Sequence, residues 1–246
     1  MALSADASTL VIGASGYNSF TGYYVKVYRT DDDGGNRLQL GQTIYGNATG
    51  NLFGRSVNIA ANGMHIVLGS PGNYNHMEYV QVFSLDSSDE AVTSTWKQIG
   101  ENIAREAIGD EIGLSVTISD DGETIAVGAY PNDGNNAQDS GRVRIYRLEN
   151  NGTSWEQFGE DIDGKAAGDW SGHSVSLSSN GSFFSIGSIG AGMDGVWADG
   201  QVKVLRIDSG GSRSWEQLGE SICGDNSSLR CAYLLPRVVF ELGQLQ

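Results

Sequence analysis

The sequence predicts an all-β fold, a β-propeller built from four-stranded blades of about 59 residues that form an incomplete ring. Three observations lead to this prediction. The 246-residue chain repeats itself, the repeat alternates apolar and polar residues, and the chain holds 35 glycines but only 3 prolines. Alternation with a period of two is typical of half-buried strands, and many short strands at even spacing favour repeated β-sheets. Glycine without a three-residue period excludes collagen.

Two motifs recur at fixed spacing. The motif Gly-x-Ser-Val begins at Gly54, Gly113 and Gly172, so its copies are 59 residues apart. The motif Trp-x-Gln-hydrophobic-Gly-x-x-Ile begins at Trp96, Trp155 and Trp215, at spacings of 59 and then 60 residues. Each copy is therefore one structural unit that stacks on its neighbours. Because the tryptophans recur in register, we expect them to fill the packing between blades.

One repeat contains four predicted strands. Residues 115–118 alternate polar and apolar side chains, and 119–122 (Ser-Asp-Asp-Gly) have the composition of a tight turn. Residues 124–129 form a nearly continuous apolar run, which predicts a strand buried on both faces. Residues 142–147 alternate strictly, which predicts a strand with one solvent-facing side, and 155–158 alternate again as the fourth strand.

The repeats divide the chain into five predicted parts. These are an incomplete N-terminal blade over 1–49, blades over 50–107, 108–166 and 167–224, and a divergent C-terminal tail over 225–246. Since Met1 to Leu3 align with the end of a first strand, we expect the chain to be a fragment of a longer propeller. The alternative is a closed four-bladed propeller in which residues 233–240 supply the missing strand. Pro236 disfavours it, because proline removes a donor from the ladder.

The repeated residues resemble the FG-GAP repeat, the blade unit of the integrin α-subunit propeller, in its short variety without calcium. The resemblance rests on Phe53-Gly54 with Gly69-Ser70-Pro71, and on Ile112-Gly113 with Gly128-Ala129-Tyr130-Pro131. It implies a non-enzymatic binding or adhesion-type module and an extracellular or cell-surface location.

We expect no cofactor. Integrin-type blades carry a calcium loop, but the matching turns here, such as 119–122, are too short to wrap the six to eight oxygen ligands that calcium prefers. Calcium is therefore possible but not supported by these Asp/Asn-Gly turns, whose acids and amides are expected to form the turns themselves.

Charge limits the partners. The chain has 30 acidic and 15 basic residues and a net charge of −15, which excludes a nucleic-acid surface because phosphate binding needs clustered Lys and Arg. No apolar run is long enough for a membrane span, and the N-terminus has no signal-peptide pattern. The compartment cannot be inferred from the two cysteines, Cys223 and Cys231. A protein or a glycan is the expected partner.

No catalytic constellation is visible, because the three histidines occupy different repeat positions. The candidate ligand-binding residues are non-repeating aromatic and acidic residues in loops that a propeller brings to one face, around its central channel: Tyr130, Asp133, Asp139, Asp169, Trp170, Asp194 and Trp197. The expected function is binding at this acidic face, although the loops could simply keep the protein soluble. Two alternatives stay open, a structural spacer and a hydrolase or lyase acting on polysaccharide. The enzyme would require carboxylates or a histidine to converge on the channel.

Overall fold

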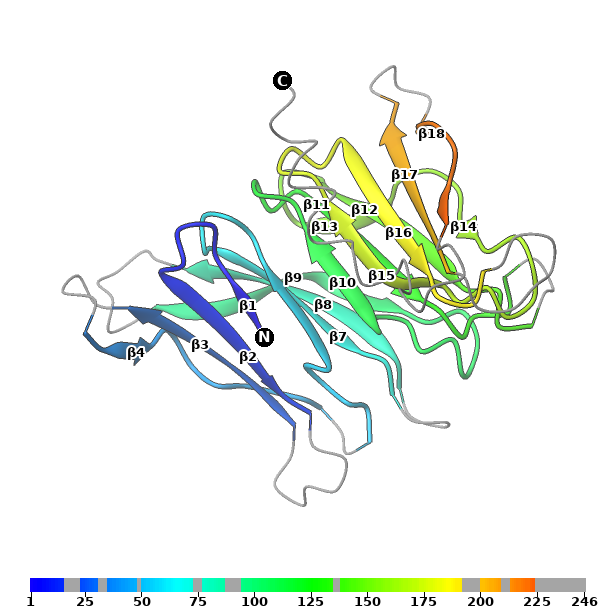
Figure 1. Ribbon diagram of the computed structural model, residues 1–246. Coiled ribbons are helices and arrows are strands. Elements are labelled where there is room, and N and C mark those ends of the chain that lie inside the picture. The colour runs from blue at the N-terminus through cyan, green and yellow to red at the C-terminus, as the bar shows by residue number, and fades with distance from the viewer. Residues whose placement is uncertain are drawn as a thin grey trace.

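The computed structural model describes residues 1–15, 23–30, 35–47, 50–72, 77–86, 94–134, 138–191, 200–208 and 213–223. In these residues the repeating secondary structure is β-strand, and the strands form four antiparallel sheets that follow one another along the chain (Figure 1). The first four strands of each sheet form a meander, because they pair in the order in which they occur in the sequence, and in three sheets a short fifth strand pairs with the third. Among the described residues, no helix has the length and apolarity needed to cross a membrane.

The first two sheets lie in the N-terminal part of the chain. The first contains β1 (Ala2–Leu3), β2 (Thr9–Ala14), β3 (Tyr24–Thr30), β4 (Arg37–Gln39) and β5 (Ile44–Tyr45). The second contains β6 (Ser56–Ile59), β7 (His65–Ser70), β8 (Tyr79–Asp86) and β9 (Thr95–Ala104).

The third and fourth sheets repeat this pattern. The third contains β10 (Ser115–Ile118), β11 (Thr124–Ala129), β12 (Arg142–Glu149), β13 (Ser154–Gln157) and β14 (Ile162–Asp163). The fourth contains β15 (Ser171–Leu177), β16 (Phe183–Ser188), β17 (Gln201–Ile207), β18 (Trp215–Gln217) and β19 (Ile222–Cys223). As predicted, β11 is buried along its whole length.

The glutamine of the Trp-x-Gln motif holds the fourth strand together where a glycine turn interrupts it. Between β13 and β14, Gln157 Nε2 donates to the Gly159 carbonyl oxygen (3.2 Å) and to Asp161 Oδ1 (2.8 Å). The equivalent glutamines in the other three sheets make the same pair of contacts, to the glycine two residues on and to the side chain four residues on; they are Gln39, Gln98 and Gln217.

The recurring glycines lie where neighbouring sheets touch. A Cβ atom on Gly128 would be 2.2 Å from the Gly172 carbonyl oxygen of the next sheet, so only glycine fits there. The Ser115 hydroxyl donates to that same oxygen at 2.7 Å. The preceding pair of sheets repeats this contact between Gly69 and Gly113. The glycine motifs are therefore contacts between blades, which any tightly stacked array of this geometry requires.

The recurring tryptophans also pack between sheets, as the sequence analysis predicts. Trp96 is buried in the core shared by the first two sheets, where its ring lies on Gly41. Trp155 and Trp215 pack against the next two cores in the same way. Each of the three cores draws its residues from two consecutive sheets.

The four sheets form an open array. The first strand β10 lies against both β6 and β15, which places these first strands at the inner side of the array. Figure 1 shows the first sheet (blue) and the fourth (yellow to orange) at opposite ends, and the sheets are not closed into a ring. The propeller with an incomplete ring is confirmed, and the closed four-bladed alternative is wrong because the described parts of the first and fourth sheets share no core. Residues 233–240, expected to close that ring, lie outside the described residues. The division into domains stays a prediction.

Candidate functional site

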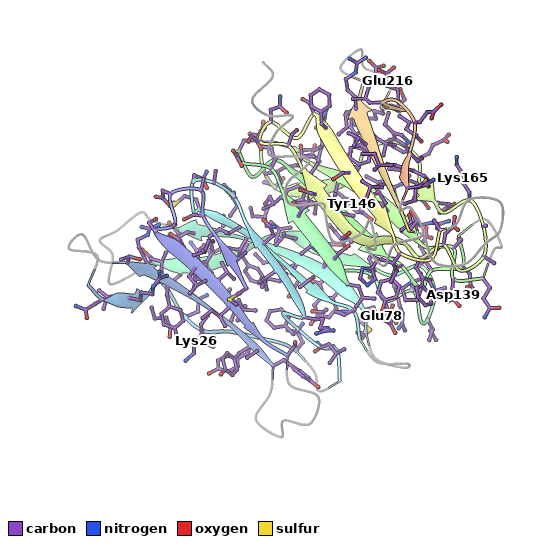
Figure 2. All side chains as sticks on the ribbon, in the orientation of Figure 1. Lys26, Glu78, Asp139, Tyr146, Lys165 and Glu216 are labelled. Atoms are coloured by element: carbon purple, nitrogen blue, oxygen red, sulfur yellow. The ribbon has the colours of Figure 1, made fainter. Side chains whose placement is uncertain are left out.

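Two loops of the third sheet pack together at one end of the array. The connection after β11 and the connection after β14 are joined by hydrogen bonds from Gly168 N to the Gln138 carbonyl (2.9 Å) and from Trp170 N to the Asp139 carbonyl (3.2 Å). Figure 2 shows Asp139 and Glu78 at this end of the molecule and Glu216 at the other. The connections between second and third strands and between blades thus share one face, as expected for a propeller.

An aromatic cluster lies on this face, beside the beginning of the inner strand β15. The ring centroids of Tyr130 and His173 are 5.0 Å apart, and those of Tyr130 and Trp170 are 6.3 Å apart with an edge-to-face orientation. His173 is on β15 itself, whereas Tyr130 directly follows β11. Three side chains from two neighbouring sheets therefore converge where the inner strands begin.

Two charged side chains act electrostatically on the Tyr130 phenol. Burial raises the pKa of Tyr130, the negative charge of Glu111 raises it further, and the positive charge of Arg55 lowers it. Burial, followed by the charge of Glu78, also raises the pKa of the Glu111 carboxyl group. Arg55 and Glu111 come just before β6 and β10, so they too lie at the ends of inner strands. We call Arg55, Glu111, Tyr130, Trp170 and His173 the mouth cluster.

The repeat positions two of these side chains through an unusual backbone conformation. Leu52, Glu111 and Trp170 are 59 residues apart, and all three have a positive φ, of 53°, 50° and 52°. A left-handed conformation is uncommon for residues other than glycine. Because it recurs at the same repeat position with three different side chains, it belongs to the architecture, while the side chain at that position varies from blade to blade.

Glu78 holds the Glu111 backbone in place. Its side chain is fully buried and pairs with Arg105 Nη1 at 2.8 Å. It also accepts hydrogen bonds from the backbone N–H of Gly109 (3.1 Å) and of Glu111 (2.7 Å). Three donors hold this buried carboxylate in one orientation. Glu78 is thus a positioning residue for the Glu111 side of the mouth cluster.

The structure brings together only part of the predicted ligand-binding set. Tyr130 and Trp170 are in contact through the mouth cluster. Asp133 Oδ1 accepts the Asp139 N–H at 3.0 Å, so this pair shapes its loop. Asp169 Oδ2 accepts the N–H groups of Lys165 (2.9 Å) and Ala166 (3.0 Å), which closes a turn. Asp194 and Trp197 lie outside the described residues. The role of these residues in binding stays a prediction.

Sequence reasoning missed Arg55, Glu111 and His173. His173 and Arg55 occupy the same repeat position, which was interpreted as an ordinary variable position. That position begins the inner strand of each blade, so its side chains gather at the centre of the array. The available signal for a functional site was that the residue type at this position varies from blade to blade although the position begins an inner strand.

A second polar group lies on the third sheet. Arg144 pairs with both Asp161 oxygens at 2.7 Å and with Glu106, and Arg142 Nε pairs with Asp163 at 2.6 Å. A small cleft, open to solvent, is lined by Glu106, Arg142 and Arg144 of this group, together with Asp110, Ile112, Val127, Ala129 and Asn132. Residues 142–147 were expected to have one solvent-facing side. This expectation is wrong for Arg144, which is only 8% exposed and has carboxylates that compensate its charge.

In the ranges that the structure describes, no three His, Cys, Asp or Glu side chains are placed to hold a metal ion together. In the short turn at 119–122, which was not expected to hold calcium, an acidic side chain accepts hydrogen bonds from the turn itself. Asp121 Oδ1 accepts from the Ser119 hydroxyl (2.5 Å) and from the Glu123 N–H (2.9 Å). The calcium question itself stays a prediction.

Comparisons with known proteins define the fold. No protein-family model matches the sequence, and a search of curated proteins finds no match. Among solved structures, the chain is similar to the periplasmic gluconolactonase PpgL of Pseudomonas aeruginosa, with 16% identity and a TM-score of 0.56 over 93% of this chain and 58% of that one. It is similar to a putative 6-phosphogluconolactonase from Bacteroides uniformis, with 17% identity and a TM-score of 0.56 over 92% of this chain and 56% of that one. The chain spans less than two thirds of either protein.

These comparisons correct the expected family and function. Both similar structures are described as lactonases, and nothing found supports an FG-GAP or integrin-like protein. The FG-GAP resemblance is therefore wrong, and so is the non-enzymatic binding or adhesion-type function that was inferred from it. The physical reason is that the quoted glycines mark contacts between blades, so they report the stacking of sheets and not a family. A cell-surface location is not supported, and the periplasmic location of the similar protein PpgL is only loosely compatible with the expected extracellular or cell-surface location.

Proposed function

We propose that this protein is a propeller-fold hydrolase that opens a small cyclic ester, with the mouth cluster as its active site. The observation that carries the proposal is the convergence of His173, Tyr130 and Glu111 at the inner ends of the strands. An enzyme on this fold requires carboxylates or a histidine to converge on the channel, and these residues do so. It joins an imidazole, a phenol and a carboxyl group of raised pKa on one face.

Hydrolysis of a lactone needs a base for water and stabilisation of the developing oxyanion. In the proposed reaction, His173 takes a proton from water as the water oxygen bonds to the ester carbonyl carbon. The ring C–O bond then breaks, and the proton passes to the departing ring oxygen, which leaves a hydroxy acid. Imidazole suits this role because its ordinary pKa lies near neutrality. Arg55 and the Tyr130 hydroxyl would stabilise the oxyanion.

The substrate class follows from the site and from the similar structures. Trp170 offers an aromatic face to the apolar face of a sugar ring. Arg55 offers a cation to the carboxylate that forms. The two similar structures are named for gluconolactone and its 6-phosphate, which supports a sugar lactone as substrate. PpgL is periplasmic, and on this basis we propose a location outside the cytoplasm.

The experiment measures the acid released from glucono-δ-lactone and from its 6-phosphate, with spontaneous hydrolysis subtracted. We expect hydrolysis above the spontaneous rate, and a loss in kcat/KM of about tenfold to a hundredfold in Tyr130→Phe and Glu111→Gln. Tyr45→Phe is the matched control, because Tyr45 is 64% exposed and lies in the first sheet. Hydrolysis at the spontaneous rate, or equal kcat/KM in all variants, would overturn the proposal.

A further inference from the structure

One position of the repeat places a polar side chain on the third strand of every sheet. In each case the residue pairs in register with an apolar residue of the second strand. The four residues at this position are Lys26, Gln81, Arg144 and Lys203. Three of them are buried, Gln81 at 6%, Arg144 at 8% and Lys203 at 6% exposure. A buried polar or charged group costs free energy unless it has partners, so each needs compensation.

The second and third sheets supply that compensation. Gln81 is neutral, and its Nε2 donates to Gln98 Oε1 and Asn102 Oδ1, both at 2.8 Å. Arg144 is charged and has two carboxylate partners, Asp161 and Glu106.

The fourth sheet lacks these carboxylates. At the positions equivalent to Asp161 and Glu106, the chain has Ser221 and Lys165. Burial lowers the pKa of Lys203, and the positive charge of Lys165 lowers it further, while Asp169 opposes this effect. The Asp169 carboxylate is already engaged, because it accepts two backbone N–H groups. In the part of the chain that the structure describes, the Lys203 side chain has neither an ion pair nor a hydrogen bond.

Two serine hydroxyls share the face on which Lys203 lies. Ser171 pairs in register with Ser188, and Ser188 pairs with Gln201, two residues before Lys203 on β17. Residues paired in register point to the same side of a sheet, as do residues two apart on one strand. Ser171 is fully buried, and its hydroxyl has no hydrogen-bond partner among the described residues. Ser188 is 2% exposed.

This side of the fourth sheet faces the third sheet. Ile186, which pairs in register with Lys203, packs in the core with Ala126, Val143 and Ile145 of the third sheet. The cation and the two hydroxyls therefore lie between the sheets, at the place equivalent to the cleft beside Arg144. Among the residues that the structure describes, the two carboxylates that compensate Arg144 have no counterpart there.

We propose that a small oxyanion, a carboxylate or a phosphate, binds between the third and fourth sheets, held by the Lys203 ammonium group and the Ser171 hydroxyl. The anion takes the place that Asp161 and Glu106 hold beside Arg144. This site is distinct from the mouth cluster, and it does not depend on the proposed hydrolase function.

The test measures the melting temperature in sodium phosphate and in sodium acetate against sodium chloride of equal ionic strength. An anion at ten times its Kd is expected to raise the melting temperature of the native sequence by about 3 to 6 °C. Lys203→Met should lose this shift. It should still fold, because methionine removes a buried charge without a partner. Ser171→Ala should weaken anion affinity about tenfold.

The matched control is Lys26→Met, which removes the same charge at the equivalent position of the first sheet. There the ammonium group lies 5.5 Å from the centre of the Tyr24 ring, and we expect the shift to be retained. Lys165→Glu places a carboxylate beside Lys203, at the position where Glu106 pairs with Arg144 in the third sheet. It should raise the melting temperature in chloride and abolish the shift with phosphate or acetate.

A shift with phosphate alone assigns a phosphate site, and a shift with both anions assigns a general oxyanion site. The proposal is overturned if neither anion shifts the native sequence, or if Lys203→Met keeps the full shift.

Discussion

The indole Nε1 of Trp96 donates a 2.9 Å hydrogen bond to the Leu40 carbonyl oxygen of the preceding sheet. The Trp96 backbone and the Gln42 side chain add two more bonds, of 2.7 and 2.8 Å. The equivalent Trp155 is half-buried, and its Nε1 has no hydrogen-bond partner in the residues that the structure describes. One repeated tryptophan thus ties two sheets together by a hydrogen bond, whereas another does so by packing alone.

This difference makes Trp96→Phe and Trp155→Phe a matched pair. Both lose ring volume, but only Trp96→Phe leaves a buried carbonyl oxygen without its donor. We expect Trp96→Phe to lower the free energy of unfolding by about 1 to 3 kcal/mol more than Trp155→Phe does. Urea unfolding followed by tryptophan fluorescence and circular dichroism measures both. Equal losses would show that the hydrogen bond to Leu40 contributes nothing.

The glycine contacts between sheets predict a second effect. In Gly128→Ala the new Cβ atom would meet the Gly172 carbonyl oxygen at 2.2 Å, and the sheets must separate to admit it. We expect a loss of about 1 to 3 kcal/mol, the usual cost of overpacking. Gly35→Ala is the control, because a Cβ there has no atom within 4 Å. A Gly128→Ala variant as stable as Gly35→Ala would contradict the role given to the glycine motif.

The ion pairs of Arg144 predict a dependence of stability on pH. Burial alone would raise the pKa of Asp161, but the hydrogen bond and charge of Arg144, with the charge of Arg142, lower it below its ordinary value. A carboxyl group whose pKa is lower in the folded state stabilises the fold above its unfolded pKa. This contribution is lost as the pH falls through the folded value, so the loss begins below about pH 4.

Asp161→Asn should remove this part of the acid sensitivity. At neutral pH it should lower the free energy of unfolding by about 3 kcal/mol, because the Arg144 side chain is 10% exposed and keeps only Glu106 as a carboxylate partner. Urea unfolding at pH 7 and pH 3 provides the comparison. If the gap between Asp161→Asn and the native sequence is as wide at pH 3 as at pH 7, Asp161 does not have the lowered pKa.

The fold was predictable because the residues of the repeated motifs are the ones that form the contacts between blades. Gly128 and Ser115 lie at fixed spacing from Gly172, since each blade must touch the next in the same way. Those same constraints misled the assignment of family, because contacts between sheets look alike in unrelated propellers.

The mouth cluster was only half predictable. Tyr130 and Trp170 stand out in the sequence because they do not repeat. His173 and Arg55 do not stand out, since their proximity to Tyr130 follows from how the inner strands β6 and β15 are placed in space. The buried network around Arg144 was hidden for a similar reason, because its partners Glu106 and Asp161 come from segments on either side of β12.

The most direct test of the central claim compares the hydrolysis of glucono-δ-lactone by His173→Asn and by His65→Asn. His65 is the matched control, because it lies on β7 away from the mouth cluster and its Nδ1 has no hydrogen-bond partner within the described ranges. We expect His173→Asn to lose about a hundredfold or more in kcat/KM at unchanged melting temperature, whereas His65→Asn keeps the native value. Equal kcat/KM in the two variants would contradict it.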